Sequence, residues 1–214
     1  MSASDVGVSV TQWVENPTGG RDRGPVALAR AWAEVLVRPR RLFRSAVAPG
    51  DQAPGLAFAA TVVLVEETSR VAFGVAAYPT LGNQPLVSTV FWLALATVLV
   101  APAALHLTAA LQTLVLRALV ADRAGISETV QVIAYAAAPG VFAGVPVPEI
   151  RLLAAAYGTL LLAIGTSEVH EISLGRAAAV VALPAALVFG YGFRGFAALS
   201  AVTGLSWADV AGAL

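Results

Sequence analysis

Hydrophobic and polar positions follow one another in long blocks along most of this chain. From residue 56 onward, nearly continuous apolar runs are separated by short stretches that contain proline, glycine, asparagine or charged residues. Most of these runs have close to the roughly 20 residues that an α-helix needs to cross a hydrocarbon core about 30 Å thick. The pattern therefore predicts an all-α fold, an integral membrane bundle of five transmembrane helices. The predicted spans are 56–78, 86–120, 127–145, 149–166 and 174–199.

The second run is too long for a simple crossing. As one helix it would reach about 50 Å, so it either tilts and projects beyond the membrane or bends at Pro102. No polar turn divides residues 86–120. We therefore favour a single crossing here, which gives five spans in preference to six.

The residues before the first span form two segments. Residues 1–24 lack hydrophobic periodicity, so we expect a mobile polar tail without a cleavable leader. In residues 25–47, apolar and basic residues fall on opposite faces of a helix, which is typical of an amphipathic segment in the headgroup region. The alternative is a helix that packs on a soluble partner. The predicted membrane-surface residues are Trp32, Arg38, Arg40, Arg41 and Arg44.

Composition supports the membrane assignment and excludes several kinds of site. Hydrophobic residues make up 58% of the chain and charged residues 12%, with a mean hydropathy of +0.79. The chain has no cysteine, and all 13 basic residues are arginines. These absences exclude thiolate chemistry, cysteine-ligated metals and lysine Schiff bases. With only two histidines, we expect no histidine-rich metal site. We also expect no cofactor and no nucleic-acid partner.

Arginines flank the predicted spans unevenly, which predicts an orientation. Most of them precede the first span or lie near the connections that follow the second and fourth spans, whereas only Arg151 and Arg194 lie near the opposite ends. Because arginine-rich flanks stay on the cytoplasmic side, we expect a multi-pass protein of the cell membrane with a cytoplasmic N-terminus. An odd number of spans then places the short C-terminal tail, residues 200–214, outside.

Three charged residues lie within the first predicted span. On a helix, Glu66, Arg70 and Glu67 fall at about 0°, 40° and 100°, so they share one sector with the arginine between the acids. An isolated charge at mid-bilayer costs about 2.5–3.5 kcal/mol. We therefore expect the three to face protein or water, and the glutamate that Arg70 does not neutralise to be protonated or bonded to another helix.

Polar side chains on the next two predicted spans are candidate partners for these charges, with His106 the first choice. One interpretation is that the whole set holds three helices in register; the other is a role in proton handling, substrate contact or catalysis. The predicted intramembrane polar cluster comprises Glu66, Glu67, Arg70, His106, Thr113, Gln131 and Tyr135. Prolines predict helix kinks at Pro102 and Pro139, and a kink at Pro139 would free the carbonyl of Tyr135.

Catalytic motifs are not supported. "HEISL" at 170–174 has leucine where a zinc-protease motif needs its second histidine, and no G-x-S-x-G surrounds a serine. "EETSR" at 66–70 resembles the first motif of the CPBP intramembrane proteases, in which water held by Glu67 and His106 would hydrolyse a peptide. The chain departs from that family in its glutamate–arginine spacing and in having no further intramembrane histidine. We assign no catalytic residue.

Another resemblance covers most of the chain. "WAEVLVRPRRLF" at 32–43, "ISETVQVIAYAAAP" at 126–139 and "EVHEISLGRAAAV" at 168–180 resemble, in order and spacing, segments of Yip1-domain membrane proteins of the prokaryotic, archaeal branch. The resemblance implies a five-span domain over 56–199 with a cytoplasmic N-terminal region. In eukaryotes this family is associated with vesicle traffic and Rab-type GTPases, a pathway that prokaryotes lack.

These observations predict a non-enzymatic membrane scaffold or organising factor. Its expected partners are the lipid bilayer with its anionic headgroups, and other membrane proteins or further copies of the chain. Two alternatives remain: a small-solute or proton-linked permease that uses Glu66, Glu67, Arg70 and His106, and the intramembrane protease described above.

Overall fold

The computed structural model describes residues 24–76, 78–120 and 124–205, so the predicted tail 1–24 lies almost wholly outside the described residues. All regular elements in the described residues are helical. In chain order they are α1 (Pro25–Val37), α2 (Pro39–Ala46), α3 (Ala53–Ala72), α4 (Pro85–Leu95), the π-helix η1 (Ala96–Val100), α5 (Ala101–Leu119), α6 (Ile126–Ala136), the 3-10 helix η2 (Ala138–Phe142), α7 (Pro148–Val169), α8 (Leu174–Ala185), the π-helix η3 (Ala186–Gly192) and α9 (Gly195–Thr203).

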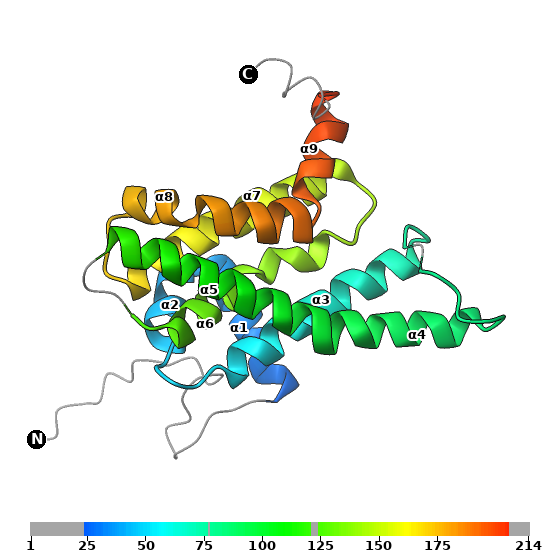
Figure 1. Cartoon of the computed structure of the whole chain (residues 1–214), viewed down its shortest axis with the longest axis horizontal. Coiled ribbons are helices and arrows are strands. Elements are labelled where there is room, and N and C mark those ends of the chain that lie inside the picture. Colours follow the sequence, from blue (N-terminus) through cyan, green and yellow to red (C-terminus); the bar gives the residue numbers. More distant parts are fainter. Residues whose placement is uncertain (1–23, 77, 121–123, 206–214) are drawn as a thin grey trace, which may run out of the picture.

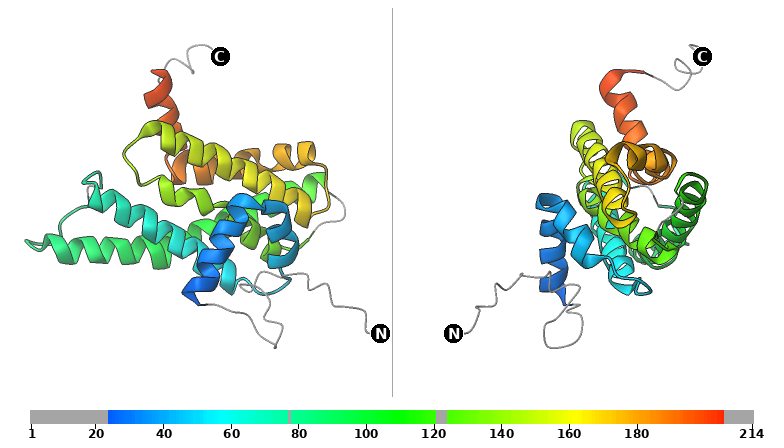
Figure 2. Two further views of the ribbon diagram at one scale, coloured as in Figure 1. Left: turned by 180° about the vertical axis from the view of Figure 1, so that it is seen from behind. Right: turned by 90° about the vertical axis from the view of Figure 1, so that its left-hand side faces the viewer.

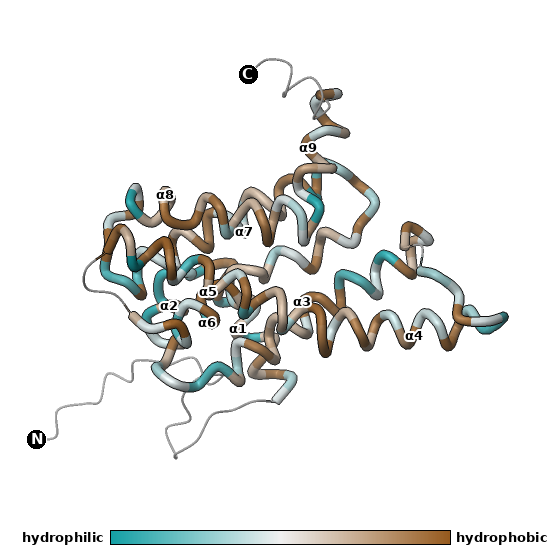
Figure 3. The backbone as a smooth tube through the Cα atoms, viewed as in Figure 1, coloured by the Kyte–Doolittle hydropathy of each residue, from teal (hydrophilic) through white to brown (hydrophobic). Residues whose placement is uncertain are grey.

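The structure is that of a membrane protein. Within the described residues, three helices are long and apolar enough to cross a bilayer: Pro85–Leu119, Pro148–Val169 and Leu174–Gly192. In Figure 3 these three helices are mostly hydrophobic along their length. Hydrophilic residues lie near the turns and at the C-terminal end of α3. Many large apolar side chains point outward, for example Leu86 and Val98, both 75% exposed, which a hydrocarbon surrounding would cover.

Five helical segments run back and forth along one direction (Figure 1). They are α3, α4–α5, α6–η2, α7 and α8–η3, in the order of the five predicted spans. α3 carries three charged residues within its 20 residues, and α6 has only 11 residues, about 16 Å of helix. A crossing by these two segments therefore stays a prediction.

The long second segment is one helix, as the missing polar turn predicted. Pro85–Leu119 is continuous over 35 residues. The π-helix η1 ends two residues before Pro102, and a kink at this proline stays a prediction. A proline lacks the N–H that would bond four residues back, and its ring collides with that carbonyl, so a widened turn accommodates it without breaking the helix.

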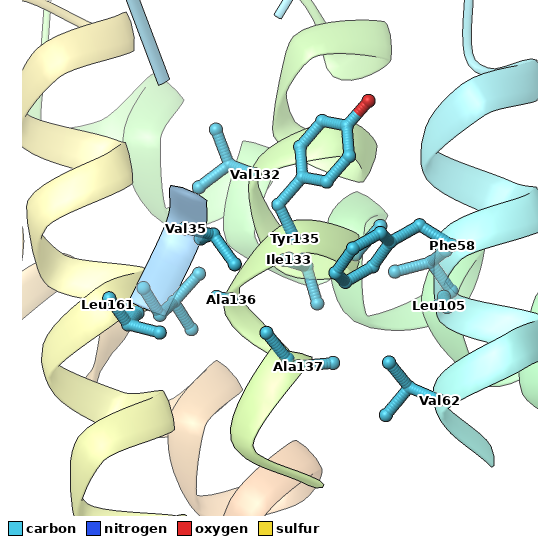
Figure 4. Close-up of a cluster of buried hydrophobic side chains, with 14 of the residues drawn as sticks. Val35, Phe58, Val62, Leu105, Val132, Ile133, Tyr135, Ala136, Ala137 and Leu161 are labelled. Carbon is cyan, nitrogen blue, oxygen red and sulfur yellow. The ribbon is translucent and has the colours of Figure 1, made fainter. Parts of the chain in front are cut away.

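α6 is the central helix of the bundle. Residues 129–140 are all buried, and α6 packs against α3, α5 and α7. Figure 4 shows its Tyr135 and Ile133 among side chains from α3, α5 and α7; the rings of Phe58 and Tyr135 meet edge to face with centroids 5.2 Å apart. The buried face of α6 includes the polar Thr129 and Gln131, and both side chains are hydrogen-bonded. Near Pro139 the chain changes from α-helix to the 3-10 turn of η2.

α1 and α2 pack on the bundle of the same chain. Ala27, Ala31 and Val35 of α1 are fully buried, and Figure 2 shows α1 crossing the long helices. The Trp32 ring nitrogen donates to the Ala138 carbonyl at 2.9 Å, and the Tyr157 hydroxyl donates to the Leu36 carbonyl. The apolar face of this amphipathic segment is therefore used inside the fold.

The last predicted span, 174–199, is shorter in the structure. The α8–η3 helix ends at Gly192, and α9 turns away from it (Figure 1). Arg194 adopts a left-handed conformation with φ 59°, which ends a helix because the carbonyl of such a residue no longer points along the axis. The predicted tail 200–214 begins inside α9, and residues 206–214 lie outside the described part of the chain.

Candidate functional site

The charged residues of α3 form the centre of a buried cluster. Arg70 lies one turn beyond the two glutamates: its Nη1 is 2.7 Å from Glu67 Oε2, and its Nε is 4.0 Å from Glu66 Oε1. These distances follow from helix geometry alone, since residues three and four apart share a face. Glu66 is only 2% exposed, so its carboxylate needs a further partner.

That partner is Arg194, from the turn between η3 and α9. Its Nη1 donates to Glu66 Oε1 at 2.5 Å and its Nη2 to Glu67 Oε1 at 3.0 Å, so one guanidinium bridges both acids. The planar, forked guanidinium suits this double contact better than any other side chain. The left-handed backbone at Arg194 is sparsely populated for a non-glycine residue, and the two ion pairs hold it there.

The surrounding chain fixes the cluster from two other sides. The Tyr78 hydroxyl donates to Glu67 Oε2, which gives this carboxylate three donors. Gly144, in the connection after η2, lies so close to α3 that a Cβ atom would stand 2.4 Å from the Glu66 carbonyl oxygen. The cluster therefore joins α3, the η2–α7 connection and the start of α9 at one end of the bundle.

Two hollows border this cluster. A cavity of about 230 Å³ lies on its inner side, between α3, α5, α6 and both π-helices, and its polar lining residues are Glu66, Glu67 and Thr108. A second pocket of about 320 Å³ lies on its outer side and is lined by Arg70, Arg151 and Arg194 together with Val75, Pro146 and Pro148. The charges thus separate an apolar cavity from an arginine-lined pocket.

The remaining predicted cluster residues lie elsewhere. His106 Nε2 is 3.0 Å from Gln52 Oε1 and its Nδ1 is 2.7 Å from the Pro102 carbonyl, so the expected contact with the glutamates is absent. The reason is the antiparallel register of α3 and α5, which places His106 beside the start of α3. Without that histidine next to Glu67, the hydrolytic pair of the protease alternative is not assembled.

Thr113, Gln131 and Tyr135 are buried but serve other contacts. The Thr113 hydroxyl donates to the Ala109 carbonyl at 2.7 Å, within its own helix. The Gln131 amide bonds the backbone of Ala48 twice, at 2.7 Å and 3.1 Å, and so ties the chain between α2 and α3 to α6. The structure therefore does not gather these three with the charged residues.

A second polar group lies at the other end of the bundle, and sequence reasoning missed it. Gln112 and Thr166 are fully buried and joined by a hydrogen bond of 2.9 Å between α5 and α7. Thr129 Oγ1 lies 3.5 Å from Nε2 of His170, which is only 2% exposed. Polar side chains four residues apart, at 166 and 170, were the available signal.

The predicted membrane-surface arginines lie near this second end. Arg40 and Arg44 both pair with Glu168, and Arg41 pairs with Glu34 at 3.2 Å. Arg38 is exposed. Trp32 is half-buried, and its ring nitrogen donates to the Ala138 carbonyl. Contact of these arginines with lipid headgroups stays a prediction.

Comparison with known families settles the relationship that the segment resemblances suggested. The Yip1 domain matches residues 33–194, from α1 to the arginine that closes the charged cluster. The chain belongs to the Yip1-domain family. No curated protein and no solved structure matches this Yip1-domain protein.

Within the described residues, no group of histidine, aspartate and glutamate side chains could hold a metal ion.

Proposed function

We propose that this Yip1-domain protein is a non-enzymatic, five-span membrane scaffold, in which the charged cluster fastens helices together. The observation that carries the proposal is the bridge from Arg194 to Glu66 and Glu67, which lie 128 and 127 residues earlier in the sequence. Charged groups that satisfy one another across helices stabilise a defined arrangement.

A scaffold also needs a surface for partners, and the long helix offers one. Only Ser88 of α4 is buried, and the other face of Pro85–Leu119 exposes large apolar side chains along its length. At 35 residues the helix is about 52 Å long, well beyond the hydrocarbon thickness. This helix supports contact with another membrane protein or a second copy of the chain.

The proposed orientation follows from the arginines. The N-terminal segment with Arg38, Arg40, Arg41 and Arg44 would face the cytoplasm, where anionic headgroups attract it. The charged cluster of Glu66, Glu67, Arg70 and Arg194 would then lie near the external surface.

Crosslinking mass spectrometry in the native membrane tests the scaffold role. We expect wild type and Glu67→Gln to capture the same neighbours, with a lower melting temperature for the variant. The control is Glu149→Gln, which changes an exposed glutamate at the first turn of α7 and should alter neither result.

Reconstituted liposomes provide the opposing outcomes. A scaffold should show neither solute-driven proton uptake nor proteolysis. Proton uptake that Glu67→Gln abolishes would establish the permease instead. Cleavage of a membrane substrate that is lost with both Glu67→Ala and His106→Ala would establish the protease.

A further inference from the structure

The arginine-lined pocket has a charge excess that the ion pairs of the cluster do not remove. Arg70 and Arg194 pair with the two glutamates, whereas the side chain of Arg151 donates to two backbone carbonyls, Ala143 at 2.9 Å and Val145 at 3.3 Å. Three guanidinium groups against two carboxylates leave a formal charge of +1. None of the six residues that line the pocket is acidic, because Glu66 and Glu67 face the inner cavity.

We propose that Arg70, Arg151 and Arg194 bind a phosphate-type oxyanion in this pocket. Arginine presents five N–H donors in a planar fork that matches phosphate oxygens two at a time. The hydrogen bonds of Arg151 to the two carbonyls and of Arg194 to the two glutamates use two nitrogens of each guanidinium, so donors remain on both side chains. A volume of about 320 Å³ is at the lower end of the range for small-ligand pockets and exceeds what a phosphate group needs.

The pocket is also held in shape before a ligand arrives. Arg151 is fixed by the two carbonyls of the η2–α7 connection, and Arg194 by both glutamates. Because these side chains are already ordered, binding an anion orders few further rotamers. Pro148 begins the 22-residue helix α7 beside the pocket, so the positive end of the α7 dipole lies next to it, and the exposed Glu149 in the same first turn offsets part of that charge.

The position in the bundle indicates which phosphates can reach the pocket. It lies at the end of the molecule where α3 and α8–η3 finish and α7 begins, opposite the end that holds α2 and Glu168 (Figure 1). In a membrane-spanning bundle, this end lies at the height of the lipid headgroups, so the phosphate of a phospholipid can reach the pocket. An inorganic phosphate ion offers the same oxyanion chemistry. This site is separate from the N-terminal arginines, and its ligand goes beyond the scaffold role.

Thermal unfolding of the full chain in a non-ionic detergent tests the proposal. Three titrations separate the sources: inorganic phosphate, dihexanoyl phosphatidylglycerol and the zwitterionic dihexanoyl phosphatidylcholine. We expect a saturable rise in melting temperature. A rise with inorganic phosphate identifies a soluble anion, and a rise with the short-chain lipids alone identifies a lipid headgroup.

Arg151→Gln is the informative variant, because it removes one guanidinium without breaking an ion pair of the cluster. Loss of one charge-assisted contact should weaken binding roughly ten- to a hundredfold. Arg151→Lys keeps the charge but loses the fork, so we expect intermediate affinity, and it replaces the glutamine variant if that one does not fold. Arg176→Gln, an exposed arginine at the start of α8, should bind like wild type.

Three results would overturn the proposal. The first is no saturable stabilisation of wild type by any of the three compounds. The second is unchanged affinity in both Arg151 variants. The third is equal weakening by Arg176→Gln, which would show that the anion responds to overall charge and not to this pocket.

Discussion

Removing the Arg194 guanidinium should loosen α3 from the start of α9. Arg194→Leu keeps much of the side-chain volume but deletes the contacts with Glu66 Oε1 at 2.5 Å and Glu67 Oε1 at 3.0 Å. The carboxylate of Glu66, a residue only 2% exposed, is then left with Arg70 at 4.0 Å as its nearest counter-charge.

The size of the loss can be worked from burial. Breaking a buried ion pair by removing one partner costs about 3–5 kcal/mol. The Arg194 side chain is 29% exposed and Arg70 still neutralises part of the charge, so we place the loss at about 2–3 kcal/mol. At about 2–4 °C per kcal/mol for a chain of this size, the melting temperature should fall by roughly 4–12 °C.

The assay is thermal unfolding in detergent, completed by a double-mutant cycle with Glu66→Gln. If the two side chains interact as the structure shows, the cycle should give a coupling free energy above about 1 kcal/mol. Arg176→Leu is the control and should change stability by no more than about 0.5 kcal/mol, since Arg176 is exposed. A melting temperature for Arg194→Leu within 1 °C of wild type, or a coupling near zero, would refute the reasoning.

Two further predictions concern packing and topology. Gly158→Ala should destabilise the fold by about 1–3 kcal/mol in the same unfolding assay, because its Cβ would stand 2.3 Å from the buried ring of Phe189, whereas Gly175→Ala, with nothing within 4 Å, should not destabilise. For topology, Asn83→Cys and Gly175→Cys place single thiols in a cysteine-free chain at exposed positions of opposite ends. An impermeant maleimide should label Asn83→Cys in intact cells and Gly175→Cys only after permeabilisation; the reverse pattern, or both labelled from outside, would contradict the five-span orientation.

The local parts of the structure were predictable. The contact between Glu67 and Arg70 needs only the three-residue spacing of a helix, and the unbroken helix Pro85–Leu119 needs only the lack of a polar turn. The change from α-helix to a 3-10 turn near Pro139 likewise follows from a missing N–H. Each of these features depends on residues a few positions apart.

The predicted contact between His106 and the glutamates was wrong, because residue spacing within one helix does not give the register between two helices. His106 was expected beside the glutamates as a polar side chain of the next predicted span, but the helical pattern gives the face on which a residue lies and not its height along the axis. α3 and the helix Pro85–Leu119 run antiparallel on either side of the turn at 79–84, so residues at equal distances from this turn lie at the same height. Glu66 is then level with about residue 97, and His106 is level with the start of α3. The contact of His106 with Gln52 agrees with that register.

The sequence alone determined that this chain belongs in a membrane, which runs are helical and where its basic residues gather, because hydrophobicity and helix length act within single segments. Only the tertiary structure decided that Arg194 forms ion pairs with Glu66 and Glu67. It also decided that Arg151 and Arg70 line the same pocket and that α6 packs against α3, α5 and α7. These contacts join residues up to 128 positions apart. Helix order and register bring such residues together, and no periodicity within one segment encodes them.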